Sequence, residues 1–299
     1  MFSNGFSDVD DPEKCHDHSE VPDAWPALDE ILGYQVRVRQ RIRTLLETAN
    51  SDRKVGRALW LAFEHEAMHL ETFLYMLLQS EKILPPPGTT VPDFESMARE
   101  AKAKRVPNEW HVVPQRQITI GLDDPEDDLG PDRYFGWDNE RPARTVDVPA
   151  FEAQSRPITN GEYARFLELS GLGRLPASWA VKDSTRSAAN GANGYANGLN
   201  GHGGGGGENP SHKFMQGKFV RTVYGSVPLE HALDWPVMAS YDELAAFASW
   251  SNGRIPKFEE ARSIYNYVST KEDVAAKKPT GLISAVNGFV SVFVVTNPL

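Results

Sequence analysis

The most informative stretch of this chain is Leu61-Ala-Phe-Glu-His-Glu-Ala-Met-His-Leu-Glu-Thr-Phe-Leu-Tyr-Met-Leu-Leu78. Its apolar residues recur at helical spacing, and His65 and His69 project from the same face of the expected helix, about one turn apart. That spacing lets both imidazoles reach one divalent metal ion. The pattern therefore predicts a metal site with His65 and His69 as two ligands, and a third ligand must come from elsewhere in the molecule.

Two amphipathic helices are expected in this region, over residues 27–49 and 53–80. The break between them is short, so they should pack antiparallel as a hairpin. The run Pro85-Pro-Pro-Gly88 ends the second helix. That helix is apolar over most of its circumference, which predicts that it is buried. One hairpin cannot cover such a surface alone, so further helices must come from another chain or be absent from this one.

After residue 110 the pattern changes to short extended segments, such as residues 117–120 and 145–148, separated by turn-rich stretches. Two short helices are expected at 159–170 and 240–251, because each opens with a capping-box spacing. Residues 190–207 consist largely of Gly and Asn and include His202. This low-complexity run is expected to be a flexible loop with a solvated histidine, since it has almost nothing to bury.

Composition excludes several classes of partner. A net charge of -10 argues against nucleic acid, and the alternating arginines from Arg37 to Arg43 spread over more than one helix face. Cys15 is the sole cysteine, so neither an internal disulfide nor a thiolate cluster is expected. No signal peptide is visible at the start, and the longest apolar run, Phe289–Val295, is too short to span a bilayer. A cytoplasmic protein with no membrane partner is the expectation.

The histidine pair has other interpretations. The two residues could be buried core histidines, hydrogen-bonded to neighbouring carboxylates. The stretch His65-Glu66-Ala-Met-His69 also fits the zinc-protease pattern H-E-x-x-H, with Glu66 as the general base. The extended form of that pattern needs a histidine where Tyr75 stands. Cys15-His-Asp-His18 lies in a stretch without regular periodicity, which favours an exposed loop over a metal cluster.

Several ordered motifs in the second half resemble the formylglycine-generating-enzyme (sulfatase-modifying factor) domain. The stretches that carry this resemblance are Asp138–Phe151, Arg156–Phe166, Trp235–Trp250 and Gly253–Ala261. Ile255, Lys257 and Phe258 depart from the usual residues of the last motif. The resemblance implies a C-type-lectin-like fold for this part of the chain.

This domain, preceded by a helix with the His-x3-His-x-Glu motif, resembles the non-haem iron sulfoxide synthases of ergothioneine biosynthesis, and most closely their fungal members. The resemblance covers roughly residues 8–288. It implies an iron(II) cofactor and oxidative C–S bond formation between a cysteine-type thiol and trimethylhistidine (hercynine), with O2 as oxidant. It also implies a DinB-like helical bundle. The missing helices and a histidine methyltransferase domain would belong to a full-length parent chain.

Residue by residue, His65 and His69 match two of the family's three iron-binding histidines. Glu71 matches the glutamate of the motif and would orient the ligands without binding iron itself. Met68 stands where bacterial relatives often have Gln, which puts contacts to the substrate there in doubt. The family's first iron histidine would lie upstream of this sequence. His16 and His18 fall after the position that it should occupy.

The resemblance implies an α+β fold: a partial DinB-like bundle followed by a lectin-like domain. The expected parts are an irregular segment 1–26, a helical hairpin 27–84, a linker 85–110 and an incomplete second domain 111–299 with a flexible insert at 182–213. The domain's second half, which holds the family's catalytic tyrosine, would continue beyond this sequence.

We therefore expect a fragment that is inactive alone and prone to aggregate, because its apolar helix faces and the run Phe289–Val295 favour self-association. If it were active, the third ligand would have to be sought among His16, His18, His111 and His231. The alternative hypothesis is a non-catalytic, lectin-like binding or vestigial protein.

Overall fold

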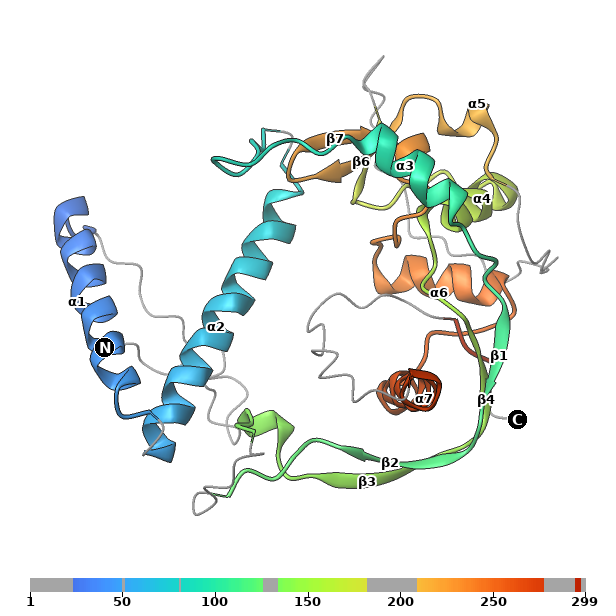
Figure 1. Cartoon of the computed structure of the whole chain (residues 1–299). Helices are drawn as coiled ribbons and strands as arrows, with labels where there is room; N and C mark the ends of the chain where they lie inside the picture. Colours follow the sequence, from blue (N-terminus) through green and yellow to red (C-terminus); the bar gives the residue numbers. More distant parts are fainter. Residues whose placement is uncertain are drawn as a thin grey trace. The chain divides into compact units, whose positions relative to one another are not determined.

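The computed structural model describes residues 24–49, 52–80, 82–125, 134–181, 209–276 and 294–296. These residues form helices and small antiparallel sheets, so the fold is α+β, as predicted (Figure 1). The chain divides into two compact units, Met1–Ala62 and Phe63–Leu299.

Helices α1 (Leu28–Leu46) and α2 (Arg53–Leu77) lie where the apolar periodicity predicts them. Acidic residues in the first turn of α1 and Arg43 in its last turn complement the helix dipole. The Asp52 carboxylate begins α2, because it accepts hydrogen bonds from the backbone N–H groups of Lys54 and Val55. The DinB-like character of this pair and its packing as a hairpin stay predictions.

The prediction that α2 is buried is wrong for this chain. In the described residues neither α1 nor α2 has a buried side chain, and Phe63 and Leu70 of α2 are 69% and 63% exposed. An apolar helix face requires a partner surface for burial, and periodicity alone cannot show that the partner is present. The exposed face is consistent with the expected self-association.

Residues 85–110, predicted as a linker, contain helix α3 (Phe94–Ala103). Asp93 begins this helix by accepting a hydrogen bond from the backbone N–H of Ser96, at 2.9 Å. The ring of Phe94 packs edge-on against Trp235, with centroids 5.6 Å apart. The segment is therefore attached to the second domain by tertiary contacts that its local composition does not reveal.

Two antiparallel strand pairs form a curved ribbon (Figure 1). β1 (Trp110–Val113) pairs with β4 (Phe151–Gln154), and β2 (Arg116–Ile120) pairs with β3 (Arg144–Val148). The second pair confirms the extended segments expected at 117–120 and 145–148. Its buried residues include Ile118, which together with neighbouring apolar side chains forms one of the two hydrophobic clusters.

The second cluster lies among α4 (Asn160–Ser170), α6 (Tyr241–Trp250) and a three-stranded sheet. The strands of that sheet are β5 (Trp179–Val181), β6 (Lys218–Thr222) and β7 (Gly225–Pro228), with β6 in the middle. Both predicted helices are confirmed, because the structure shows reciprocal capping boxes. The capping pairs are Thr159 with Glu162 and Ser240 with Glu243. Rings of Tyr163, Phe166, Trp179, Phe247 and Trp250 fill the cluster.

The predicted flexible insert 182–213 extends too far at its C-terminal end. Residues 182–208, which include the run 190–207 and His202, lie outside the described residues. Residues 209–213 are described: Pro210 is buried, and Ser211 begins the short helix α5 (His212–Met215). The backbone N–H of Ser211 also donates to the Glu168 carboxylate at 3.1 Å, so long-range contacts order this end of the segment.

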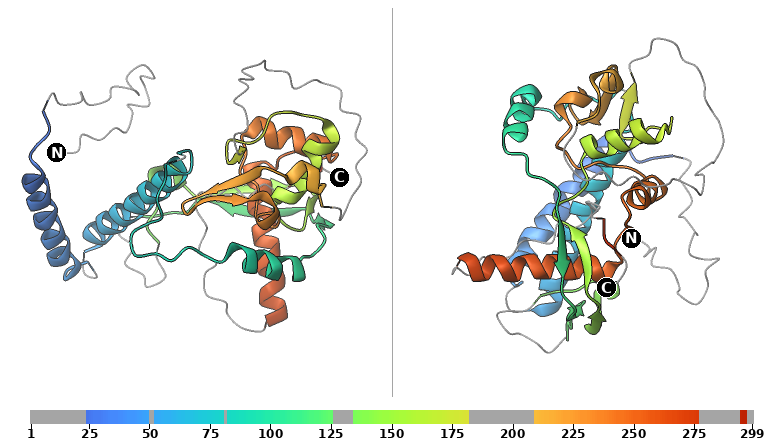
Figure 2. Two further views of the ribbon diagram at one scale, coloured as in Figure 1. Left: turned by 90° about the horizontal axis from the view of Figure 1, so that it is seen from above. Right: turned by 90° about the vertical axis from the view of Figure 1, so that its right-hand side faces the viewer.

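Helix α7 (Phe258–Ala276) lies on the concave side of the β1–β4 and β2–β3 ribbon (Figures 1 and 2). A short C-terminal segment, residues 294–296, runs antiparallel to both Ala153 and Arg254. Its Val294 and Val295 are 0% exposed. Both valines belong to the run Phe289–Val295, which is expected from the sequence to favour self-association. For Val294 and Val295 that expectation is wrong, because they fill the core.

Helix α7 is anchored at its start by an ion pair between Arg254 and Glu260, with a shortest distance of 2.6 Å. Glu260 also accepts a hydrogen bond from the backbone N–H of Lys257, at 2.8 Å. Burial acts to raise the pKa of Glu260, but Arg254 and the Lys257 amide outweigh it, and the net pKa is lowered. The charged carboxylate therefore stabilises the folded state.

Replacing Glu260 with Gln should lower the free energy of unfolding by about 2 kcal/mol at pH 7. A lowered folded-state pKa contributes stability above the pKa of the unfolded chain, about 4.3, and that stability is lost as pH falls through the folded-state value. The gap between wild type and Glu260→Gln in urea unfolding should thus close below about pH 4. Glu259→Gln is the control, and a gap that stays constant down to pH 3 would contradict this assignment.

None of the helices in the described part of the chain combines the length and the apolar character needed to cross a membrane. The short helix η2 (Asp138–Glu140) precedes β3 along the chain.

Candidate metal centre

His65 and His69 lie on α2 with their Nε2 atoms 3.1 Å apart and their ring centroids 4.6 Å apart. Both side chains are exposed. Two nitrogens that each lie ~2.1 Å from one metal ion, at right angles, are ~3.0 Å apart. The pair therefore fits two adjacent positions in the coordination sphere of a single ion, as the helical spacing predicts.

The short distance between the two Nε2 atoms also restricts which ring nitrogens of the pair can carry a hydrogen. Without a cation, one Nε2 must carry a hydrogen that it donates to the other, because two lone pairs would otherwise face each other. A metal ion would instead use both Nε2 lone pairs, and each neutral ring would then carry its hydrogen on Nδ1.

Two aromatic side chains contact the pair. Phe73, one turn further along α2, lies with its ring centroid 6.5 Å from that of His69. Trp137 lies edge-on to His65, with centroids 6.4 Å apart and an interplanar angle of 79°. Trp137 is not among the residues predicted from the sequence. The one signal for it there is its position directly before the motif that starts at Asp138.

Trp137 is held in place by its own short helix, η2, which begins directly after it. Its backbone N–H donates to the Glu140 carboxylate at 3.0 Å, and its carbonyl accepts from the Glu140 N–H at 3.1 Å. The preceding Gly136 N–H donates to the buried Asp124 carboxylate at 3.2 Å. The Glu140 carbonyl in turn accepts from the N–H of Leu122, at 3.0 Å. Backbone bonds therefore set where the Trp137 ring lies.

The remaining predicted residues are not brought to the pair. Glu71 is half-buried, two residues beyond His69 and hence on another side of the helix. Within the described residues it makes no hydrogen bond to either imidazole, so its orienting role stays a prediction. His111 lies on β1, opposite Ala153, and His231 lies in η3 (Leu229–His231).

No group of three potential metal-binding side chains forms within the part of the chain that the structure describes. His16 and His18, together with Cys15, lie outside the described residues. Within the described residues, the predicted centre thus consists of the two facing imidazoles of His65 and His69.

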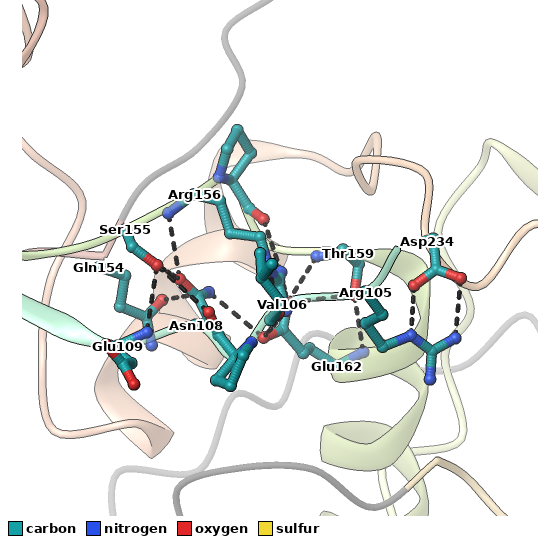
Figure 3. Close-up of polar contacts among 12 residues, drawn as sticks. Arg105, Val106, Asn108, Glu109, Gln154, Ser155, Arg156, Thr159, Glu162 and Asp234 are labelled. Atoms are coloured by element: carbon teal, nitrogen blue, oxygen red, sulfur yellow. Dashed lines mark hydrogen bonds and ion pairs between the residues drawn. The ribbon is translucent and has the colours of Figure 1, made fainter. Parts of the chain in front are cut away.

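A polar network fastens residues 105–108 to the lectin-like part (Figure 3). The Arg105 guanidinium donates two hydrogen bonds to the Asp234 carboxylate, one of 2.8 Å, and this contact raises the pKa of Arg105 against the effect of burial. The Arg156 guanidinium forms a bidentate ion pair with the Glu162 carboxylate, with hydrogen bonds of 2.8 and 3.1 Å. Asn108 donates to the same Glu162 carboxylate at 3.2 Å. The network joins the residues after α3 to the start of α4.

Similarity to known proteins agrees with this architecture. The chain is 51% identical over 97% of its length to Ergothioneine biosynthesis protein 1 of Neurospora crassa, and covers 34% of that protein. It is 31% identical over 91% of its length to the protein of the same name in Schizosaccharomyces pombe, again covering 34%. A Hercynine oxygenase of Mycolicibacterium smegmatis is 25% identical over 75% of this chain, which covers 45% of it.

The chain thus spans about a third of the length of the two fungal relatives. Residues 96–263, more than half of the chain, match the Sulfatase-modifying factor enzyme 1-like domain. This range contains most of α3, all of α4 and α6, and the strands between them. The chain therefore belongs to the family defined by the sulfatase-modifying factor enzyme 1-like domain.

Proposed function

We propose that this chain is part of an iron(II)-dependent enzyme of ergothioneine biosynthesis, which joins a cysteine-type thiol to trimethylhistidine (hercynine) as a sulfoxide. The observation that carries the proposal is the pair of Nε2 atoms 3.1 Å apart on α2, in a chain that continues into a sulfatase-modifying factor enzyme 1-like domain. Relatives named for ergothioneine biosynthesis and for hercynine oxygenation support it. A cytoplasmic location is part of the same proposal.

The residues present suit iron(II). Two neutral imidazoles leave other coordination positions open, which is typical of non-haem iron enzymes. Iron, when bound, would supply the one-electron and dioxygen chemistry that side chains lack. Our proposal gives His65 and His69 the task of holding the ion, and Glu71 that of orienting them. The third histidine, further helices and a methyltransferase domain would come from a longer parent chain.

Metal binding by the 299-residue chain should depend on both histidines. We expect His65→Ala to weaken cobalt(II) or anaerobic iron(II) binding about 100-fold, because a lost ligand costs at least as much as the loss of its supporting contacts. Titration followed by calorimetry would measure this. His111→Ala is the matched control, since His111 lies on β1 away from α2. Equal affinities of the wild type and the His65→Ala chain would contradict the assignment.

Activity must be tested on a chain extended at both ends to the length of the fungal relatives. With iron(II), O2, a cysteine-type thiol and trimethylhistidine, we expect formation of the carbon–sulfur bond, and its loss in His65→Ala and His69→Ala. The 299-residue chain alone should form none. Failure of the extended chain to bind iron would favour the alternative of a non-catalytic, lectin-like binding protein. Proteolysis that is abolished by Glu66→Gln would instead favour a zinc protease.

A further inference from the structure

The contact between Trp137 and His65 differs from the other ring contacts of the histidine pair. Phe73 belongs to α2 itself, so its place beside His69 follows from the helix. Trp137 belongs to the loop before η2 and reaches His65 from outside the helix. A residue distant in sequence thus contributes a side chain to the surroundings of the pair, within the same compact unit Phe63–Leu299.

His65 needs such a contact. The torsion that turns an imidazole about its Cβ–Cγ bond has broad minima, so an exposed histidine samples many ring orientations. Metal-binding histidines are usually held by a hydrogen bond to the ring nitrogen that does not bind the metal. Within the described residues the His65 ring has one hydrogen bond, to His69. Nothing there holds its other nitrogen.

We propose that Trp137 is a positioning residue of the metal centre: its ring restricts rotation of the His65 imidazole and keeps Nε2 turned toward Nε2 of His69. The inference rests on the proposed function in that it takes His65 to be a ligand. An edge-on aromatic contact has a preferred geometry and contributes beyond the area that it buries. A ligand that is already oriented loses less conformational freedom when the ion binds.

The backbone around Trp137 makes this restraint firm. The loop is fixed by hydrogen bonds of the Trp137 backbone to Glu140 and of Gly136 to Asp124, so the ring starts from a defined position. These bonds involve no Trp137 side-chain atom. Trp137→Ala should therefore keep these backbone bonds while it removes the aromatic contact with His65.

The first test compares cobalt(II) affinity. We expect Trp137→Ala to bind cobalt(II) about three- to ten-fold more weakly than the wild type, the fold-change that corresponds to loss of one aromatic pair. Trp137→Phe should restore most of the affinity, because it keeps an aromatic ring at this position. The matched control is Trp25→Ala, which removes an indole that is 71% exposed. Thermal unfolding and far-UV circular dichroism should be the same for all variants.

The second test needs no metal. Diethyl pyrocarbonate modifies accessible imidazoles, and peptide mass spectrometry gives the rate at each histidine. Trp137→Ala should increase modification of His65 relative to the exposed His212, which serves as an internal standard. Trp25→Ala should leave this ratio unchanged.

The outcomes distinguish failure of the positioning role of Trp137 from failure of the proposed metal centre. If the wild-type chain binds cobalt(II) through His65 but Trp137→Ala binds it equally well, the positioning role is wrong and the metal centre stands. If the wild type shows no His65-dependent binding, the metal centre is wrong and the positioning role falls with it. An unchanged modification ratio in Trp137→Ala would also overturn the inference, because it would show that the indole does not restrain or cover His65.

Discussion

Gly253→Ala is expected to lower the free energy of unfolding by about 4 kcal/mol. A Cβ atom at this position would lie 2.3 Å from Cγ1 of Val294 and 2.8 Å from the carbonyl oxygen of Val295. Real Cβ contacts are never this short, and the second atom belongs to the backbone. The segment 294–296 would have to leave its place between β4 and Arg254.

Two terms make this displacement costly. Val294 and Val295 are 0% exposed, and burial of one such side chain contributes ~1.5–3 kcal/mol as an upper estimate. The Val295 backbone also exchanges two hydrogen bonds with Arg254, at 2.8 and 2.9 Å. A released segment regains conformational entropy, which offsets part of the free energy lost with the burial and the hydrogen bonds.

The measurement is urea unfolding of Gly253→Ala beside Gly173→Ala. Gly173 is the matched control, since a Cβ there would meet nothing within 4 Å. Hydrogen exchange at Val295 should increase in Gly253→Ala and stay unchanged in the control. A loss of stability below about 1 kcal/mol would mean that residues 294–296 contribute little to the fold.

Gly121→Ala should destabilise the chain by about 3 kcal/mol and displace the loop that carries Trp137. Gly121 has a φ of +77°, which L-residues rarely adopt, and a Cβ there would lie 2.3 Å from the carbonyl oxygen of Glu140. That carbonyl accepts the hydrogen bond of Leu122 and belongs to η2. The substitution thus combines backbone strain with a steric clash beneath the site.

The variant Gly217→Ala distinguishes the effect of backbone strain from that of the steric clash. Its φ of +74° is nearly the same, but a Cβ there would meet nothing within 4 Å. We expect Gly217→Ala to cost only the conformational term, about 1 kcal/mol. In Gly121→Ala, but not in Gly217→Ala, modification of His65 by diethyl pyrocarbonate should rise as it does in Trp137→Ala. Equal effects of the two glycine substitutions would show that the loop tolerates the added methyl group.

Features that depend on local interactions could be predicted from the amino-acid sequence. The capping boxes at Thr159 and Ser240 begin α4 and α6 as expected, because the capping groups lie three residues apart. The extents of α1 and α2 follow from apolar periodicity. The facing nitrogens of His65 and His69 follow from the helical repeat. The motifs from Asp138 onward were sufficient to indicate the domain family.

Other features depend on contacts between residues that are far apart in the sequence. Phe94 and Arg105 join α3 to the second domain through Trp235 and Asp234, so a segment with the composition of a linker is an integral part of the fold. Val294 is buried in the core although its neighbours in sequence indicate only an apolar run. Trp137 meets His65 across a separation that no local pattern spans. Capping and periodicity involve residues within about one turn of each other, whereas burial and the surroundings of a site depend on which distant surfaces meet, and that is known only once the chain has folded.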